Sequence, residues 1–175
     1  MATLRLEPLR ESMREAYLDI ALEMIQHREP NTEWHFDRAL NDFTGLLKYY
    51  QERARGINLP PGFSPETKLF GVVDGIIIGR VGIRHSLTPT QTETLGHIGY
   101  IVRPTWRGKG YGKQLFSLAL THAREFGLDK IHIVSRRDNY PSLRILAQVS
   151  ATPQSIIRDA HGIERSRFII DLKRT

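Results

Sequence analysis

The residues with the clearest chemical potential are six consecutive ones, Arg107-Gly108-Lys109-Gly110-Tyr111-Gly112. They follow a short apolar run, 98–102, and they precede a strongly helical run, 113–126. A glycine-rich turn at a helix N-terminus binds phosphate, because unpaired backbone N–H groups and the positive end of the helix point into it. Glycines also let the backbone approach a bulky anion closely. The segment therefore predicts a phosphate-binding loop.

Three known glycine-rich patterns compete for this loop. A Walker A loop needs Ser or Thr after its Gly-Lys pair, but Gln114 follows Gly112-Lys113. The dinucleotide pattern G-x-G-x-x-G does not fit either, because the glycines recur at every second position. The pattern Arg/Gln-x-x-Gly-x-Gly/Ala is matched by Arg107, Gly110 and Gly112. An ordinary turn with a basic first helical turn stays open, although Arg107, Lys109 and Lys113 would then oppose the helix dipole.

The third pattern is the pyrophosphate loop of the GNAT N-acetyltransferase superfamily, and the chain resembles that family. The stretches 79–86 and 96–100 look like a bacterial subgroup usually described as predicted acetyltransferases. The resemblance implies acetyl-CoA as the acyl-donor substrate. The seven histidines show no metal-ligand spacing, so we expect no metal. The resemblance also implies an α/β fold with a mixed, mostly antiparallel sheet. A central parallel strand pair in this sheet is splayed to hold coenzyme A, and helices flank the sheet.

The order of predicted elements agrees with that fold over nearly the whole chain. Apolar periodicity predicts helices, and β-rich runs bounded by turn residues predict strands. Asp74-Gly75 is a strong signal for a type I′ hairpin turn. We expect one domain over residues 1–175, with helices over 9–29, 37–54, 113–126 and from Asn139, strands over 68–73, 76–84, 96–102, 131–134, 154–158 and 165–172, and irregular structure over 87–94.

The resemblance assigns roles to residues that match the family's motifs. Backbone groups of Tyr100, Ile101 and Val102 would bind the pantetheine arm as an added strand does. The segment Arg107, Gly108, Lys109, Gly110, Tyr111, Gly112 and Lys113 would hold the pyrophosphate. Asn139 and Ser142 match the Asn-x-x-Ser pattern at the next helix, where Asn139 either binds pantetheine or only caps the helix.

Amide formation requires an amine that has lost its proton, so a base that removes this proton is expected. His97 is the first candidate, since its ordinary pKa of roughly 6.5 suits proton transfer near neutrality. A structural histidine bonded to a neighbouring strand is the alternative, and His85 and Glu93 are weaker candidates for the base. Relatives carry a tyrosine as the acid at the position of Leu146, so the acid is missing, supplied elsewhere or unnecessary.

Composition narrows the function further. The chain has no cysteine, which excludes disulfides and an acyl-cysteine intermediate and favours direct transfer in a ternary complex. The net charge of +6 suits an anionic ligand, but the basic residues are scattered, so we expect no nucleic-acid partner. No long apolar run or signal-peptide core is present, so we expect no membrane partner and a cytoplasmic location. A homodimer is possible on general grounds.

The main hypothesis is therefore an acetyl-CoA-dependent N-acetyltransferase acting on a primary amine, either a small molecule or a peptide. A non-catalytic acyl-CoA-binding sensor is the alternative, because Leu146 replaces the usual acid. A basic nucleic-acid-binding domain is a third and weaker hypothesis.

Overall fold

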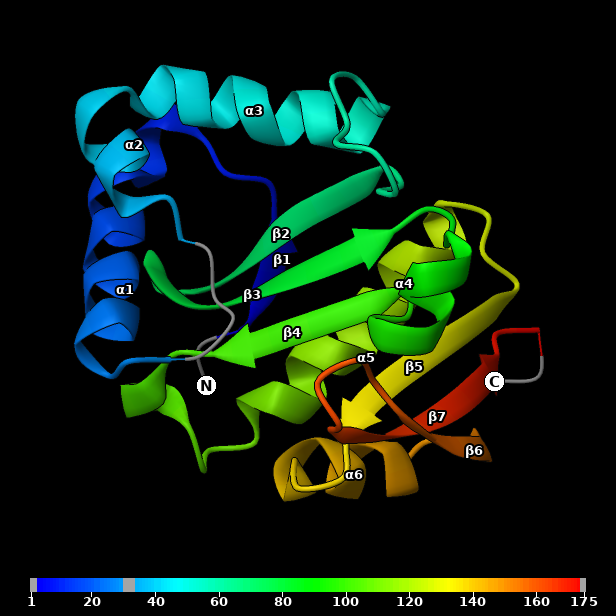
Figure 1. Cartoon of the computed structure of the whole chain (residues 1–175). Coiled ribbons are helices and arrows are strands. Elements are labelled where there is room, and N and C mark those ends of the chain that lie inside the picture. The colour runs from blue at the N-terminus through cyan, green and yellow to red at the C-terminus, as the bar shows by residue number, and fades with distance from the viewer. Residues whose placement is uncertain (1–2, 30–33, 174–175) are drawn as a thin grey trace.

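A computed structural model describes residues 3–29 and 34–173 (Figure 1). The strands form two antiparallel sheets. One sheet has the order β1-β2-β3-β4 and the other the order β5-β7-β6. The strands are β1 (Arg5–Glu7), β2 (Glu66–Val73), β3 (Ile76–Arg84), β4 (Ile98–Val102), β5 (Lys130–Arg136), β6 (Ala151–Arg158) and β7 (Glu164–Asp171). The helices are η1 (Glu11–Met13), α1 (Arg14–Gln26), α2 (Phe36–Asn41), α3 (Phe43–Arg55), α4 (Pro89–Thr94), η2 (Pro104–Trp106), α5 (Tyr111–Glu125) and α6 (Tyr140–Ala147).

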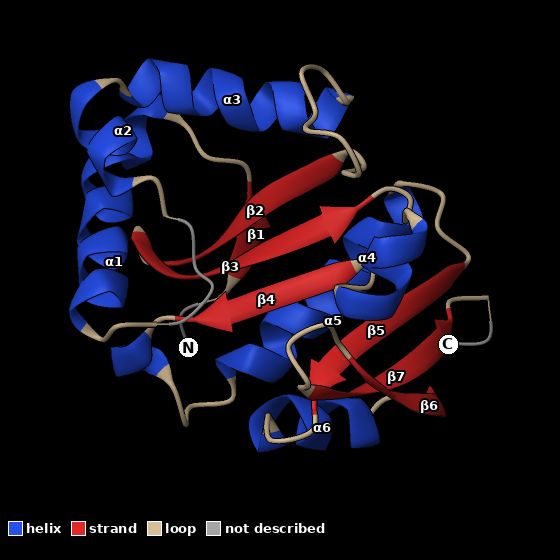
Figure 2. Ribbon diagram, in the orientation of Figure 1, coloured by secondary structure: helices blue, strands red, loops and turns tan. Residues whose placement is uncertain are grey.

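Helices cover both faces of the four-stranded sheet, and each face has its own apolar core (Figure 2). Tyr17 of α1 and Leu46 of α3 pack with Phe70 on one face. Leu115 and Phe116 of α5 pack on the other face, and that core continues into the second sheet. Side chains alternate along a strand, so each face of β2, β3 and β4 meets a different set of helices.

The hairpin between β2 and β3 has the predicted turn. Asp74 and Gly75 both have positive φ values, +48° and +79°, as a type I′ turn requires. The pairing of Lys68 with Gly82 depends on this turn and on an irregularity between Gly71 and Val72 that shifts the register. In the adjacent strand, Gly82 pairs with Gly99 of β4. Lys68, Gly82 and Gly99 form a row across the sheet.

Four expectations about the elements need correction. Residues 89–94 form the helix α4, because Thr88 and Gln91 make a capping box and Pro89 takes the first helical position. The strand β1, too short to give a periodic pattern, was not predicted. The predicted helix over 9–29 begins as η1 and is α-helical only over Arg14–Gln26. The predicted helix over 37–54 is two helices, because Asp42 leaves the helical conformation and caps α3.

The two sheets meet at a narrow seam between β4 and β5. The arrows of these strands run in the same direction (Figure 1), as expected, but no hydrogen-bonded ladder joins them in the described part of the chain. A single bridge of antiparallel pattern links Gly96 and Ile133, and the N–H of His97 donates to the carbonyl of His132 at 2.7 Å. Beyond this point the strands separate. In the ranges described, no helix has both the length and the apolar character needed to span a bilayer.

Candidate active site

The loop between β4 and α5 has the geometry of an anion-binding turn. Gly108 and Gly110 have φ values of +75° and +81°, a conformation that disfavours other residues. A Cβ at either position would meet no atom within 4 Å, so the space beside the loop is open. The first intrahelical bond of α5 runs from the N–H of Gln114 to the carbonyl of Gly110. The preceding N–H groups, from Tyr111 to Lys113, are therefore available to a ligand.

The start of the loop is fixed by one carboxylate of α1. Glu23 accepts hydrogen bonds from the Thr105 N–H at 3.0 Å and from the Thr105 hydroxyl at 2.9 Å, and it forms an ion pair with Arg103. Burial by itself would raise the pKa of Glu23, but these hydrogen bonds and the charge of Arg103 together hold it below its ordinary value. Glu23 stays ionised near neutrality and ties α1 to the loop.

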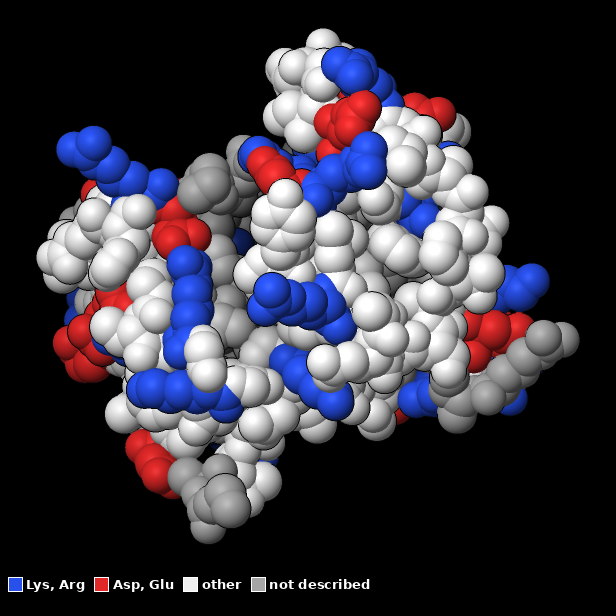
Figure 3. Space-filling model, turned by 90° about the horizontal axis from the view of Figure 1, so that it is seen from below, with Lys and Arg blue, Asp and Glu red and all other residues white. Residues whose placement is uncertain are grey.

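Basic side chains surround the loop. Arg107 donates to the carbonyl of Val102 at 3.0 Å and pairs with Glu29 at 2.8 Å, while the ammonium of Lys109 lies 5.2 Å from the centre of the Trp106 ring. Figure 3 views the molecule from the side of α6 and of this loop, and Lys and Arg side chains lie across the middle of that face. This face is therefore suited to a polyanion.

The free edge of β4 presents backbone groups from alternate residues. The backbone N–H of Arg84 donates to the carbonyl of His97, and the backbone N–H of Arg103 donates to the carbonyl of Ile78. Backbone groups alternate in direction along a strand, so those of Ile101, two residues before Arg103, also face β3. Tyr100 and Val102 have the opposite orientation and direct their backbone groups to the seam. The expectation for Ile101 is corrected, because its backbone groups are used by β3. For Tyr100 and Val102 it stays a prediction.

The helix α6 contacts this edge through its first turn. The Tyr100 hydroxyl donates to the Ser142 hydroxyl at 3.4 Å, and the Asn139 side chain accepts from the Ser142 N–H at 3.3 Å. Asn139 is thus the N-cap of α6, and a contact with a ligand stays a prediction. Leu146, where the resemblance predicts a tyrosine, is buried in the core with 1% of its surface exposed. It offers no proton donor.

His97 has contacts that favour the structural alternative. Only 7% of its surface is exposed, and its Nδ1 accepts a hydrogen bond from the His132 N–H at 3.0 Å. Burial, with a smaller effect from the neighbouring His132, lowers the pKa of His97 to about 4. A base with so low a pKa takes up a proton poorly at neutrality. The catalytic role of His97 stays a prediction.

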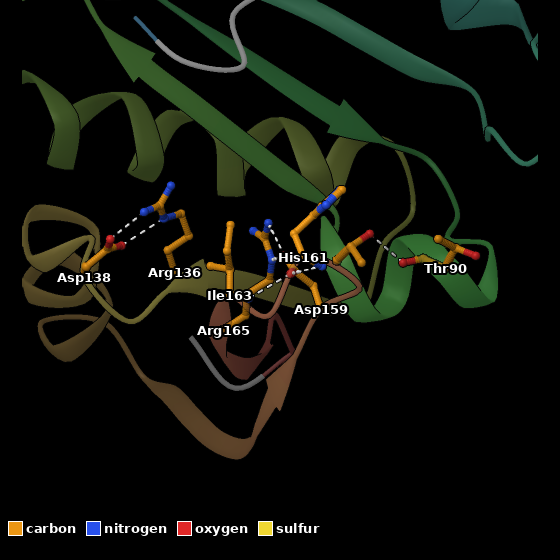
Figure 4. Close-up of polar contacts among 8 residues, drawn as sticks. Thr90, Arg136, Asp138, Asp159, His161, Ile163 and Arg165 are labelled. Carbon is orange, nitrogen blue, oxygen red and sulfur yellow. Dashed lines mark hydrogen bonds and ion pairs between the residues drawn. The ribbon is translucent and has the colours of Figure 1, made fainter.

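The turn between β6 and β7 is ordered by Asp159. Its carboxylate accepts from the N–H groups of His161 and Ile163 at 2.9 and 3.0 Å, and Arg165 pairs with it at 2.8 Å. The hydrogen bond from Ile163, with those from Arg165 and His161, holds the pKa of Asp159 below its ordinary value. Figure 4 shows these residues grouped at the turn, with Arg136 and Asp138 paired at the end of β5. The turn therefore has a fixed shape beside the second sheet.

A cavity that sequence reasoning missed lies on the opposite face of the first sheet. Its volume is about 180 Å³, and its lining residues are His35, Tyr49, Tyr50, Arg53, Phe63, Glu66, Lys68 and Arg80. Burial lowers the pKa of Lys68 to about 8, and the charge of Glu66 acts in the opposite direction. The sequence carries part of this signal, because alternate residues such as Glu66 and Lys68 share one face of a strand. The register shift between Gly71 and Val72, which places them opposite Arg84 and Gly82, has no such signal.

Within the described residues, no three His, Cys, Asp or Glu side chains are grouped so that they could hold a metal ion. The two alternatives to His97 have other contacts. The Nε2 of His85 is 2.8 Å from the Thr67 hydroxyl, and its ring stacks on Phe126. Glu93 lies on the exposed side of α4. Neither residue faces the cavity.

Comparison with known proteins identifies the family. Residues 3–152 match the family model of the acetyltransferase (GNAT) domain, so the chain belongs to the GNAT acetyltransferases. Three solved structures are similar along their length. Mycobacterium smegmatis RimJ in complex with CoA-disulfide is 19% identical, with a TM-score of 0.73 over 99% of this chain and 84% of that one.

The ribosomal L7/L12 α-N-protein acetyltransferase RimL, in complex with coenzyme A, is 17% identical, with a TM-score of 0.68 over 98% of this chain and 95% of that one. The microcin C7 self-immunity acetyltransferase MccE, in complex with acetyl-CoA and AMP, is 16% identical, with a TM-score of 0.68 over 96% of this chain and 92% of that one. At these identities the likeness shows the GNAT fold and leaves the acceptor open.

Proposed function

We propose that this protein transfers the acetyl group of acetyl-CoA directly to a primary amine. The β4–α5 loop carries the proposal. It combines two glycines with positive φ, open space beside them and three N–H groups that precede the first bond of the helix. These features fit the diphosphate of coenzyme A, which requires close approach by a backbone rich in donors. When bound, acetyl-CoA supplies a thioester carbonyl activated for acyl transfer.

The chain's own residues then have separate tasks. Backbone N–H groups from Gly108 to Lys113 would hold the diphosphate, and Arg107 and Lys109 would add charge at the rim. The outward backbone groups of Tyr100 and Val102 would align the pantetheine arm along the edge of β4. An N–H of this edge would also donate to the carbonyl oxygen, which gains negative charge during attack. The neutral amine nitrogen forms the new C–N bond, the C–S bond breaks, and coenzyme A leaves as the thiolate. The nitrogen gives one proton to solvent, and the thiolate takes one up from solvent to become the thiol.

The proposal is tested by measuring thiol release from acetyl-CoA with a panel of small amines and short peptides. We expect release that depends on both the amine and the protein. The variant Gly110→Val should lower it at least ~10-fold, because a β-branched residue at φ +81° distorts the loop. If acetyl-CoA bound tightly but no amine in the panel caused thiol release, the proposal would be contradicted.

One observation favours a second function, that of a non-catalytic acyl-CoA sensor. Leu146 is buried at the position where relatives place their acid. A thiolate leaves readily without a proton donor, so we rank catalysis first. For a sensor, acetyl-CoA would protect the protein against heat more than desulfo-CoA does, and no product would form with any amine.

A further inference from the structure

We propose that the cavity between α3 and the first sheet binds an anionic group of the acceptor, a carboxylate or a phosphate, and so selects amines that carry one. This inference deepens the proposed function and depends on it for the amine. The cavity lies on the face of the sheet that α1, α2 and α3 cover. The β4–α5 loop leads into α5 on the opposite face. Donor and acceptor would therefore occupy different sides of β4.

The cavity has an excess of positive charge. Arg53, Lys68 and Arg80 line it, whereas Glu66 is the one acidic residue among its lining residues in the described chain. That carboxylate is already matched twice, by Lys68 at 2.8 Å and by Arg84 at 3.2 Å. Only 8% of the Glu66 side chain is exposed, so water screens these charges poorly. An added anion would interact favourably with Lys68 and Arg53.

Aromatic side chains provide the rest of the wall. The guanidinium of Arg53 lies 5.2 Å from the centre of the Phe63 ring, and that of Arg80 lies 4.4 Å from the Trp34 ring. These contacts hold the guanidinium groups in place, so little side-chain entropy is lost when an anion binds. Tyr49 and Tyr50 also line the cavity, and each combines an apolar ring with a polar hydroxyl. A volume of about 180 Å³ admits a small group rather than a whole drug-sized molecule.

The surface between the Lys68 ammonium and the seam is open at one glycine of β4. Lys68, Gly82 and Gly99 are paired across β2, β3 and β4, so their side-chain positions share one face. A Cβ at Gly82 would lie 2.5 Å from Glu66 Oε1 and 2.8 Å from Lys68 Nζ, which shows that both side chains extend over this glycine. A Cβ at Gly99 would meet nothing within 4 Å.

Gly99 lies on β4, one residue from Tyr100, whose backbone groups face the seam. The Lys68 ammonium extends over Gly82 of β3, and neighbouring strands are about 5 Å apart, so an anion bound there is about one strand spacing from β4. This distance suits an amine separated from its anionic group by a few bonds. The open surface over Gly99 leaves room for the amine to reach the thioester.

The first experiment compares matched amines at one salt concentration. 4-Aminobutyrate differs from propylamine by its carboxylate, and phosphoethanolamine differs from ethanolamine by its phosphate; in both anionic members a few bonds separate the amine from the anion. We expect kcat/KM to be at least ~10-fold higher for the anionic member of at least one pair, as for charge-assisted hydrogen bonds. The pair that discriminates identifies the anion. Equal or better use of both neutral members would overturn the inference and leave acetyl transfer intact.

The second experiment removes the charges. In Lys68→Met and Arg53→Gln the preference should fall several-fold, mainly through KM, while the affinity for coenzyme A stays unchanged because the loop lies on the other face. Lys48→Gln is the control. Like Arg53, Lys48 lies in α3, but its side chain is 74% exposed and pairs with Glu52. A preference unaltered in both pocket variants would contradict the proposal.

Binding without turnover separates this inference from the proposed function. Benzoate and inorganic phosphate are each titrated into the protein in the absence of acetyl-CoA, and calorimetry measures the heat of binding. Weaker binding in Lys68→Met than in Lys48→Gln supports the pocket even if no amine is acetylated, and then only the proposed function fails. No heat with either anion, together with no preference among the amines, overturns the pocket.

Discussion

At the scale of single residues, the conformation of Gly110 determines whether the loop can bind a diphosphate. We expect Gly110→Val to weaken the binding of coenzyme A at least ~10-fold and to lower the free energy of unfolding by about 1–2 kcal/mol, because valine at φ +81° is strained. Calorimetry and chemical denaturation measure the two effects.

Gly127 provides a matched control for this variant. It has a φ of +76°, and a Cβ there would also meet nothing within 4 Å, but it follows the far end of α5. Gly127→Val should cost similar stability and leave the affinity for coenzyme A unchanged. If both variants bound coenzyme A as the natural protein does, the loop would not be the diphosphate site.

His97 gives a prediction about pH. Its pKa is about 4 in the folded protein and about 6.5 in the unfolded chain, so the unfolded state takes up the proton first. The stability associated with neutral His97 is complete above pH 6.5 and is lost as the pH falls through 4, by up to about 3 kcal/mol. His97→Asn retains an acceptor for the His132 N–H but cannot titrate. Denaturation curves from pH 7 to 4 should show a smaller loss for this variant.

The same variant tests the catalytic hypothesis. If His97 is structural, kcat at pH 7.5 should change less than ~10-fold in His97→Asn. A loss of ~100-fold or more with the fold intact would instead identify His97 as the base. His85 and His132 also have lowered pKa values, so the comparison with the variant is what isolates His97.

At the scale of elements, α1 controls the shape of the loop through Glu23. We expect Glu23→Gln to lower stability by about 2 kcal/mol, since Arg103 would lose a partner in a site where its own side chain is 11% exposed. The affinity for coenzyme A should fall several-fold because the loop is less well fixed. Asp19→Asn is the comparison, since Asp19 contacts the same arginine at 2.8 Å but is 64% exposed. An effect of Asp19→Asn as large as that of Glu23→Gln would contradict this role.

Some elements could be predicted from the sequence because their signals are local. The loop at 107–112 and the turn at Asp74-Gly75 each need particular backbone angles, and glycine supplies them at known spacing. The helix α4 was missed because its capping box lies in a polar segment with no apolar stripe. Its presence shows that Thr88, Pro89 and Gln91 specify this short helix without an apolar stripe.

The candidate site could be predicted only in part, because several of its features depend on how the strands pair and on which elements pack together. The cavity brings α3 together with β2 and β3, and no local pattern gives that contact. For Ile101, the direction of its backbone groups depends on which residue of β3 it faces. The burial of His97 depends on a bridge between sheets that are distant in sequence. Pairings of this kind are tertiary properties, and residue types along one strand do not specify them.

At the scale of the whole molecule, the seam between β4 and β5 separates the two approaches to the reacting carbonyl. Because the donor would reach the seam from one face of the sheet and the amine from the other, neither would close the route of its partner. Initial-rate plots should therefore give intersecting lines, and each product should compete only with the substrate that shares its route. Parallel lines would mean that the acetyl group rests on the protein between two half-reactions.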